Sequence, residues 1–341
     1  MLFIGKKNTP QAIELTEGKP MQVFNNALEM IGNTPMVRVN HIDTGPCELY
    51  LKLEIQNPGA SIKDRIAVAM IAAAEEQGKI KPGDTLIEAT AGNTGLGLAL
   101  VAAQKGYKLI IVLPDKMSRE KLYNLRALGA EVIETRSDVQ KGHPEYYQDL
   151  ALRLSAERGA FYINQFENPA NVQAHYDTTG PEIWQQMEGK LDAFVCGVGS
   201  GGTLTGVGRY LREQKADMEL VLADPDGSIL APLINEGKEV EAGSWRVEGI
   251  GEDFIPVICE IALAGKAYSI SDKESFAVAR EVLLKEGIMV GSSSGTLIAA
   301  ALQYCREQTE PKRVVTLACD TGCRYLSKLF NDEWLNAQDF G

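Results

Sequence analysis

The segment AFVCGVGSGGTLTGVGRYL, residues 193–211, joins three kinds of sequence that together decide the fold. Its apolar start, 193–198, is typical of a strand buried on both faces. A glycine-rich turn follows at 199–203, and a helical pattern follows the turn. A buried strand that runs through such a turn into a helix indicates a parallel α/β sheet, which binds ligands beyond the carboxyl ends of its strands.

The same alternation of short apolar runs and longer helical patterns extends along the chain. It predicts strands at 49–54, 85–90, 108–114, 130–135, 161–164, 193–198, 219–224, 267–270 and 313–319. It predicts helices at 61–77, 94–105, 118–128, 144–158, 203–214, 273–286 and 295–307. We therefore expect an α/β protein of two doubly wound, three-layer αβα domains with mostly parallel sheets, and a weak sheet signal at 165–192 marks a candidate domain boundary.

The composition restricts the partners and the compartment. The 341 residues include 46 acidic and 34 basic ones, a formal net charge of -12, which argues against a nucleic acid or an anionic membrane as partner. The first apolar run is too short for a signal peptide and no run could span a bilayer, so we expect a cytoplasmic protein. The six cysteines and three histidines show no zinc-site spacing, so we expect free thiols and no metal site.

A second strand runs into a glycine-rich turn in IEATAGNTGLGLAL, residues 87–100. Each of the two turns offers backbone N–H groups at the start of a helix, where anions bind readily. Two such sites suit a ligand, or a pair of ligands, with two negative groups such as a phosphate and a carboxylate.

The turn at 199–203 also fits a different class of enzyme. Gly197, Gly199 and Gly202 satisfy the pattern G-x-G-x-x-G, and Asp224 ends the next predicted strand. This is the dinucleotide fingerprint, so an NAD-dependent dehydrogenase is an alternative. Against it, the pattern comes late in the chain, and GSGGT is richer in glycine and hydroxyl groups than a pyrophosphate turn requires.

The stretch QNPGASIKDR, residues 56–65, places a lysine where a helix disfavours one. Ser61 and Asp64 predict a capping box, so Lys63 and Arg65 lie in the first helical turn, next to the positive end of the helix dipole. Lys63 could be an ordinary surface lysine. Beside Arg65 and partly buried, however, its amine would be pushed towards the neutral form, which attacks an aldehyde to form a Schiff base.

A third stretch, EGIMVGSSSGTLIAAAL, puts Ser292, Ser293 and Ser294 before a predicted helix at 295. One serine would serve as the N-cap. The other hydroxyls remain for another task.

At this point the sequence resembles the fold-type II pyridoxal-phosphate enzymes of the cysteine synthase and cystathionine β-synthase family. The motifs NPGASIKDR, TAGNTG, GVGSGGT, EGIGEDFIP and GSSSG occur in that order, within a resemblance that runs from residue 31 to 330. The resemblance implies a tryptophan synthase β-like fold and a homodimer. It also implies an N-terminal domain of residues 1–34 and 57–165 with a mobile substrate-binding part, and a C-terminal phosphate-binding domain of residues 35–56 and 166–335.

The resemblance also implies roles for individual residues. Lys63 is the catalytic residue and holds the cofactor covalently, Asn93 contacts its phenolic oxygen, and Ser293 meets its pyridine nitrogen. The phosphate is held by Gly199, Ser200, Gly201, Gly202 and Thr203. The substrate-binding residues are Thr90, Ala91, Gly92, Thr94, Gln165 and Gly251. Many relatives have serine where Ala91 stands, and some have an aromatic residue where Glu252 stands.

The implied activity is replacement of the β-substituent of L-serine or an activated serine by a thiol. The resemblance is closest to the cystathionine β-synthases, for which the thiol is homocysteine; a cysteine synthase that uses sulfide with O-acetylserine or O-phosphoserine is the alternative. The implied substrates are thus a small amino acid and a thiol, in cysteine biosynthesis or transsulfuration. The first histidine, His41, and the first cysteine, Cys47, lie inside the catalytic region, so we expect no haem. A scaffold that has lost activity is the non-enzyme alternative, and Lys63 argues against it.

Overall fold

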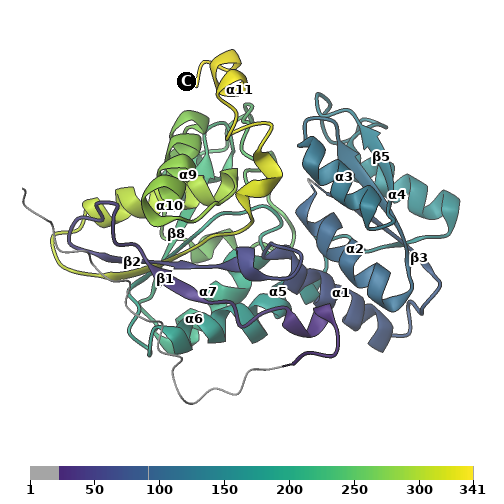
Figure 1. The fold of residues 1–341 in the computed structure, drawn as a ribbon, viewed down its shortest axis with the longest axis horizontal. Helices are drawn as coiled ribbons and strands as arrows, with labels where there is room; N and C mark the ends of the chain where they lie inside the picture. The colour runs from purple at the N-terminus through teal and green to yellow at the C-terminus, as the bar shows by residue number, and fades with distance from the viewer. Residues whose placement is uncertain (1–22, 91, 341) are drawn as a thin grey trace, which may run out of the picture.

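The computed structural model describes residues 23–90 and 92–340. It contains two α/β domains that lie side by side, a larger one built around β1, β2 and β8 and a smaller one around β3 and β5 (Figure 1). The strands are β1 (Met36–Arg38), β2 (Glu48–Lys52), β3 (Thr85–Ala89), β4 (Lys108–Pro114), β5 (Glu131–Thr135), β6 (Phe161–Tyr162), β7 (Ala193–Cys196), β8 (Glu219–Pro225), β9 (Lys266–Ile270) and β10 (Arg313–Leu317).

The α-helices follow the strands in alternation. They are α1 (Lys63–Glu76), α2 (Asn93–Lys105), α3 (Arg119–Ala127), α4 (Tyr147–Arg158), α5 (Pro169–Ala174), α6 (Gly180–Gln186), α7 (Gly202–Gln214), α8 (Leu230–Glu236), α9 (Asp272–Glu286), α10 (Ser292–Arg306) and α11 (Asp332–Ala337). Short 3-10 turns are η1 (Ala27–Met30), η2 (Glu54–Gln56), η4 (Ile261–Leu263) and η5 (Gly322–Tyr325), and η3 (His175–Thr179) is a π-helix. No helix in the described part of the chain is long and apolar enough to cross a bilayer.

Both sheets are mostly parallel, as predicted. The larger has the order β1-β2-β10-β7-β8-β9, in which only the short β1 runs antiparallel to its neighbour. The smaller has the order β5-β4-β3-β6 and is parallel throughout. In both, the carboxyl ends of the parallel strands lie at one edge, where ligands bind in such folds.

In the smaller domain, successive side chains of the strands point to opposite faces of the sheet, and helices cover both faces, so the domain has three layers. On β3, Leu86 packs into the core shared with Ile66 and Met70 of α1, whereas Ile87 packs on the opposite face with Leu150 of α4. Successive side chains of a strand point to opposite faces, so an apolar strand needs cover on both. In the larger domain, α9 and α10 lie on one side of the sheet and α6 and α7 on the other (Figure 1).

The predicted strands and helices are all present, with ends that differ by a few residues. The segment 165–192, a candidate domain boundary because of its weak sheet signal, contains helices that were not predicted: α5, η3 and α6 occupy it. The start of α5 carries a readable signal, since Asn168 caps the N–H of Ala170 at 3.1 Å and Pro169 takes the first helical position. The short β1, α8 and α11 were also missed.

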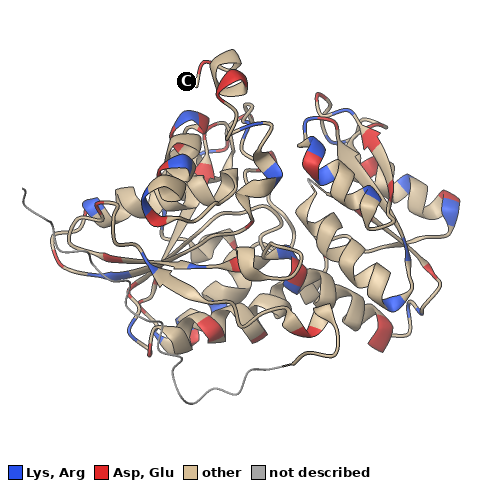
Figure 2. Ribbon diagram, viewed as in Figure 1, with Lys and Arg blue, Asp and Glu red and all other residues tan. Residues whose placement is uncertain are grey.

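Charged residues of both signs are spread along the chain in both domains (Figure 2), but one cluster is buried where the domains meet. The Arg65 guanidinium on α1 lies 2.7 Å from Glu54 of η2 and 2.7 Å from Glu182 of α6, and Lys52 lies 2.6 Å from Glu182. The carboxylate of Glu54 is fully buried and also accepts the Thr34 hydroxyl at 2.7 Å. The cluster therefore joins α1, whose apolar face belongs to the smaller domain, to the larger domain.

We predict that Arg65→Ala lowers the free energy of unfolding by about 3–5 kcal/mol, because it leaves the fully buried carboxylate of Glu54 without its ion-pair partner and Glu182 with Lys52 alone. The control is Arg126→Ala, which removes an exposed ion pair with Glu134 within the smaller domain and should change stability by about 0–1 kcal/mol. Urea unfolding followed by circular dichroism measures both. Equal effects for the two variants would contradict a structural role for the buried cluster.

Candidate active site

A cavity of about 750 Å³ lies between the domains at the carboxyl ends of their strands. Its lining brings together most of the residues that the sequence singles out, from loops far apart in the chain. These are Lys63, Thr90, Asn93, Thr94, Gln165, Gly199, Ser200, Gly201, Thr203, Gly251 and Ser293.

Three of the predicted site residues need separate mention. Gly92 and Gly202 lie beside the lining residues, at the N-termini of α2 and α7. Gly92 has a φ of 118°, a conformation that favours glycine. Ala91 lies outside the described residues, so its predicted contact with substrate has no structural account.

The loop before α7 is a cradle from which side chains are excluded. A Cβ atom on Gly199 would lie 2.5 Å from the backbone oxygen of Gly249, and one on Gly202 would lie 2.0 Å from Asn171 Oδ1. Gly201 has a φ of 87°. These contacts leave backbone N–H groups as the accessible surface at the start of α7, which is the arrangement that binds a phosphate.

Hydrogen bonds tie this loop to α5 and η3, which precede it in the chain. The fully buried Asn171 amide donates to Ser200 Oγ at 2.9 Å and to the backbone oxygen of Gln165 at 2.8 Å. The Thr203 hydroxyl lies 3.2 Å from Nε2 of His175, whose Nδ1 lies 2.9 Å from Thr179 Oγ1. Burial, followed by the charge of Lys63, holds the pKa of His175 well below its usual value, so the imidazole is neutral.

Lys63 is the first residue of α1, as expected, but the helix is capped differently from the prediction. Ser61 Oγ accepts the N–H of Lys63 at 3.3 Å, and Asp64 accepts the N–H of Gly59 at 2.6 Å. The prediction of a capping box is therefore wrong. The Asp64 carboxylate binds the backbone N–H of Gly59, in the turn before the helix, and not the backbone N–H of Ser61.

The half-buried Lys63 side chain lines the cavity. Burial lowers the pKa of its amine, and the charge of Lys121 lowers it further, while Cys319 and Asp320 act in the opposite direction. The direction agrees with the expectation from the sequence, but the predicted influence of Arg65 is wrong, because that guanidinium is paired with Glu54 and Glu182.

Asn93 is held by two charged residues near the C-terminus. Its Nδ2 donates to Asp320 at 2.8 Å, and its Oδ1 accepts from Arg324 at 2.7 Å. A side-chain amide carries two N–H donors. The second donor is therefore the group through which Asn93 can contact a ligand.

The three consecutive serines divide their tasks. Ser292 Oγ accepts the N–H of Glu248 at 3.1 Å, and Ser294 Oγ accepts the N–H of Cys319 at 2.9 Å. Ser293, 4% exposed, lines the cavity. Helix α10 begins at Ser292 rather than at residue 295.

The candidate carboxylate site is organised around Gln165. The Thr94 hydroxyl donates to Gln165 Oε1 at 2.6 Å, and Gln165 Nε2 donates to the backbone oxygen of Ala89 at 3.3 Å. The backbone N–H of Gln165 donates to the buried Glu88 at 3.4 Å. Burial raises the pKa of Glu88 to about 8, although this hydrogen bond lowers it. Thr90 Oγ1 accepts the N–H of Gly92 at 3.0 Å and so shapes the turn.

Sequence reasoning missed the contacts that close the smaller domain onto the larger one. Lys121 of α3 lies 2.8 Å from Glu248, which also pairs with Lys328 at 2.7 Å. Glu120 accepts the backbone N–H and the hydroxyl of Ser327 at 3.0 and 2.9 Å. The pairing across the two domains could not be foreseen, since Lys121 and Glu248 are 127 residues apart and Glu120 and Ser327 are 207 residues apart.

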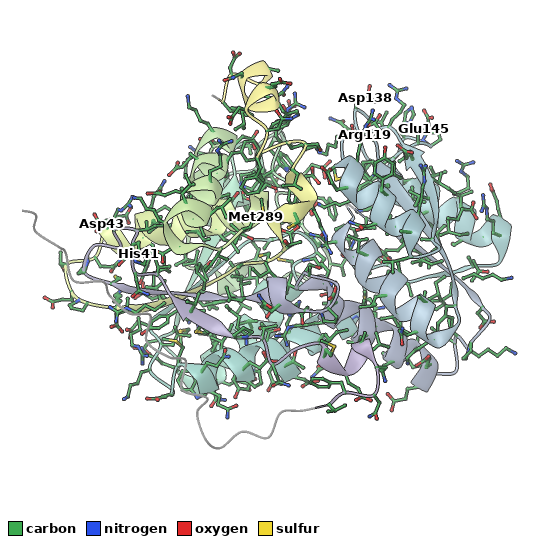
Figure 3. All side chains as sticks on the ribbon, viewed as in Figure 1. His41, Asp43, Arg119, Asp138, Glu145 and Met289 are labelled. Atoms are coloured by element: carbon green, nitrogen blue, oxygen red, sulfur yellow. The ribbon has the colours of Figure 1, made fainter. Side chains whose placement is uncertain are left out.

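The residues considered for other ligands lie elsewhere. His41 lies at the end of the larger domain that is remote from the smaller one (Figure 3) and pairs with Glu286 at 3.3 Å. Asp224, expected in a dinucleotide site, is fully buried and accepts the N–H of Ala231 at 2.8 Å. Among the residues that the structure describes, no group of three or more histidine, cysteine or acidic side chains could hold a metal ion.

The residues of this cavity fit pyridoxal phosphate. The evidence is the cradle at 199–203, which a Cβ atom would fill, and the lysine amine and serine hydroxyl that line the same cavity. Lys63 could hold the aldehyde carbon, the cradle the phosphate, and Asn93 and Ser293 the ring.

Comparisons with known proteins agree with the geometry. Residues 27–320 match the family model "Pyridoxal-phosphate dependent enzyme". The chain is 44% identical over 326 residues to the cystathionine β-synthase of Mus musculus, a match that covers 94% of this chain and 58% of the mouse enzyme. It is also 44% identical over 306 residues to a cysteine synthase of Staphylococcus aureus, covering 89% of this chain and 96% of that enzyme.

Solved structures show the same fold. A hydrogen sulfide-producing enzyme from Fusobacterium nucleatum aligns with a TM-score of 0.82 at 38% identity, covering 89% of this chain and 100% of that one. An O-ureido-L-serine synthase aligns with a TM-score of 0.83 at 33% identity, covering 93% and 100% of the two chains.

We predict that Gly199→Ala weakens the binding of pyridoxal phosphate by about tenfold or more, because its Cβ would displace the cradle from the backbone of Gly249. Fluorescence titration of the apo-protein with pyridoxal phosphate measures the affinity. Gly265→Ala is the control, since a Cβ there meets no atom within 4 Å. Unchanged affinity for Gly199→Ala would contradict the assignment of the cradle.

Proposed function

Since this chain belongs to the pyridoxal-phosphate dependent enzyme family, we propose that it replaces the β-substituent of L-serine or an activated serine by a thiol. One observation carries the proposal: the lysine amine, the glycine cradle and the Thr94–Gln165 pair share one cavity. The cradle suits the phosphate of the cofactor, and the pair suits the carboxylate of an amino acid. The family membership sets aside the NAD-dependent dehydrogenase.

Pyridoxal phosphate, when bound, supplies an electron sink for negative charge at the α-carbon of an amino acid. In the proposed reaction Lys63 removes the α-proton of the substrate and later returns it, for which a lowered pKa of its amine is required. Ser293 supports β-replacement over transamination. A hydroxyl at the ring nitrogen does not force protonation as a carboxylate would, so the sink is weaker and favours rapid loss of the β-substituent over transamination.

The substrate carboxylate has a candidate site in the turn at 90–94. The backbone N–H groups at the start of α2 and the second N–H of the Gln165 amide are the donors there, and the Thr94 hydroxyl, whose proton goes to Gln165 Oε1, orients that amide. Their positions are fixed by the bonds to Ala89 and Glu88. Binding at this turn would draw the smaller domain closer and exclude water from the cavity.

We propose homocysteine as the thiol, so that the product is cystathionine, in a cytoplasmic homodimer. The cystathionine β-synthases among the relatives support this choice, although the chain spans only 58% of the mouse enzyme and 66% of the one from Apis mellifera. A cysteine synthase that uses sulfide is the second candidate. The match to 96% of the S. aureus cysteine synthase favours it.

We predict that Lys63→Ala removes the visible absorbance of the purified protein and lowers turnover by more than about a thousandfold, because the variant lacks both the amine that holds the cofactor and the base. Absorption spectra and borohydride reduction followed by mass spectrometry test this. The control is Lys79→Ala, an exposed lysine three residues beyond the end of α1. A coloured, active Lys63→Ala variant would refute the assignment.

The substrates are tested by product identification. Wild-type protein is incubated with serine, O-acetylserine or O-phosphoserine, each with homocysteine or sulfide, and the products are identified by mass spectrometry. We expect cystathionine as the main product, with a higher kcat/KM for homocysteine than for sulfide. Cysteine as the main product would favour the second candidate instead.

A further inference from the structure

One carboxyl group in the cavity has no task in the reaction described above. Glu252 is half-buried and lines the cavity. None of the hydrogen bonds and ion pairs recorded for residues 23–90 and 92–340 uses its side-chain oxygens. Two of the other acidic residues of the lining are paired, Glu248 with Lys121 and Asp138 with Arg136 at 2.9 Å, and the remaining two, Glu241 and Asp253, are exposed to solvent.

The backbone around Glu252 is held from both sides. Its N–H donates to Ser228 Oγ at 3.1 Å, and its C=O accepts from the N–H of Ile229 at 3.1 Å. The preceding Gly251 has a φ of 85° and donates to the backbone oxygen of Val198 at 2.9 Å. A Cβ on Gly251 would lie 2.4 Å from Pro225 Cγ, so the close packing here leaves no room for another residue type. The fold therefore presents the unpaired carboxyl to the cavity from a rigid loop.

The charge around Glu252 is unbalanced. Burial and then the neighbouring carboxylates Asp253 and Asp224 raise the pKa of Glu252 well above its usual value. The charge of Lys116 lowers the pKa of Glu252. Burial lowers the pKa of Lys116 itself, and the charges of Glu248 and then Glu252 raise it. A bound cation would therefore be favoured beside Glu252.

Lys116 belongs to the smaller domain, and its side chain contacts Trp245 of the larger domain. It follows β4, and its ammonium lies 5.5 Å from the centre of the Trp245 ring. Trp245 is fixed by a hydrogen bond of 3.1 Å from its Nε1 to the backbone oxygen of Ile250. Lys116 takes part in no salt bridge recorded for the described residues. The cavity thus offers a carboxyl group and an amine whose charges act on each other, one from each domain.

We infer that Glu252 and Lys116 determine the specificity for the thiol by binding the ammonium and the carboxylate of a zwitterionic amino-acid thiol. The inference rests on the proposed β-replacement and explains why an amino-acid thiol would be preferred to sulfide. A hydrogen sulfide ion has neither group, so it gains nothing from the pair. The two groups of an amino acid are attached to one carbon atom, which suits a pair of opposite charges that interact.

The experiment compares four thiols on wild-type protein and on Glu252→Gln, which keeps the shape of the side chain and removes its charge. The thiols are homocysteine, 3-mercaptopropylamine without the carboxylate, 4-mercaptobutyrate without the ammonium, and sulfide. We expect Glu252→Gln to raise KM about tenfold or more for homocysteine and 3-mercaptopropylamine, and less than about threefold for the other two.

A second variant gives the opposite pattern. Lys116→Met keeps the length of the side chain and should raise KM for homocysteine and 4-mercaptobutyrate, but not for 3-mercaptopropylamine or sulfide. Asp253→Asn, which removes one charge from the exposed neighbour of Glu252, is the matched control and should change each KM by less than about threefold. The change in the visible spectrum on adding O-acetylserine without a thiol should be the same in all variants, which separates thiol recognition from damage to the rest of the site.

The outcomes separate the inference from the proposed function. Equal KM changes for all four thiols, or an Asp253→Asn variant that reproduces Glu252→Gln, would overturn the inference alone. A wild-type protein that turns over sulfide but shows no preference between homocysteine and its two truncated analogues would do the same. A wild-type protein that uses no thiol at all would refute the proposed β-replacement itself.

Discussion

Both sheets direct the carboxyl ends of their parallel strands to one cavity, and the rest of the site depends on this constraint. The turn after β3, the cradle after β7 and the segment after β10 belong to different parts of the chain, but each leaves its sheet at the same edge. Short turns after buried strands have little freedom, so the backbone N–H groups at the starts of α2 and α7 are placed by the sheets rather than by the ligand. The Lys63 amine enters the same cavity from the first residue of α1.

Much of the fold could be predicted because it follows from local patterns. Apolar strands that need cover on both faces, and helices between them, were readable throughout. The helices of segment 165–192 could not be predicted from periodicity, because they are short and interrupted by a π-helix, and a long window finds no repeat there. The capping signal Asn168–Pro169 was present and was the better guide.

The site could be predicted in part, for a similar reason. Glycine turns and the Ser293 hydroxyl follow directly from short motifs. Hydrogen bonds and ion pairs that depend on tertiary contacts do not follow from short motifs. Asp64 accepts the N–H of Gly59 instead of capping its own helix, and Arg65 pairs with Glu182, 117 residues away. The surroundings of Glu252 could not be predicted either. Its backbone N–H is bound by Ser228, and its charge raises the pKa of Lys116. Each of these contacts joins loops that are distant in the sequence, so it can be read only from the tertiary structure.

The strand order of the larger sheet has a consequence for synthesis of the chain. β10 lies between β2 and β7, although it is the last strand to leave the ribosome. Until residues 313–317 emerge, the β1–β2 hairpin and the β7–β8–β9 unit have no strand to join them, and each exposes an open edge that can pair with a neighbouring nascent chain. The smaller sheet uses one continuous stretch, 85–162, so it can be completed early. We therefore expect the smaller sheet to form during synthesis before the larger one, whose two halves can be joined only after β10 has been made.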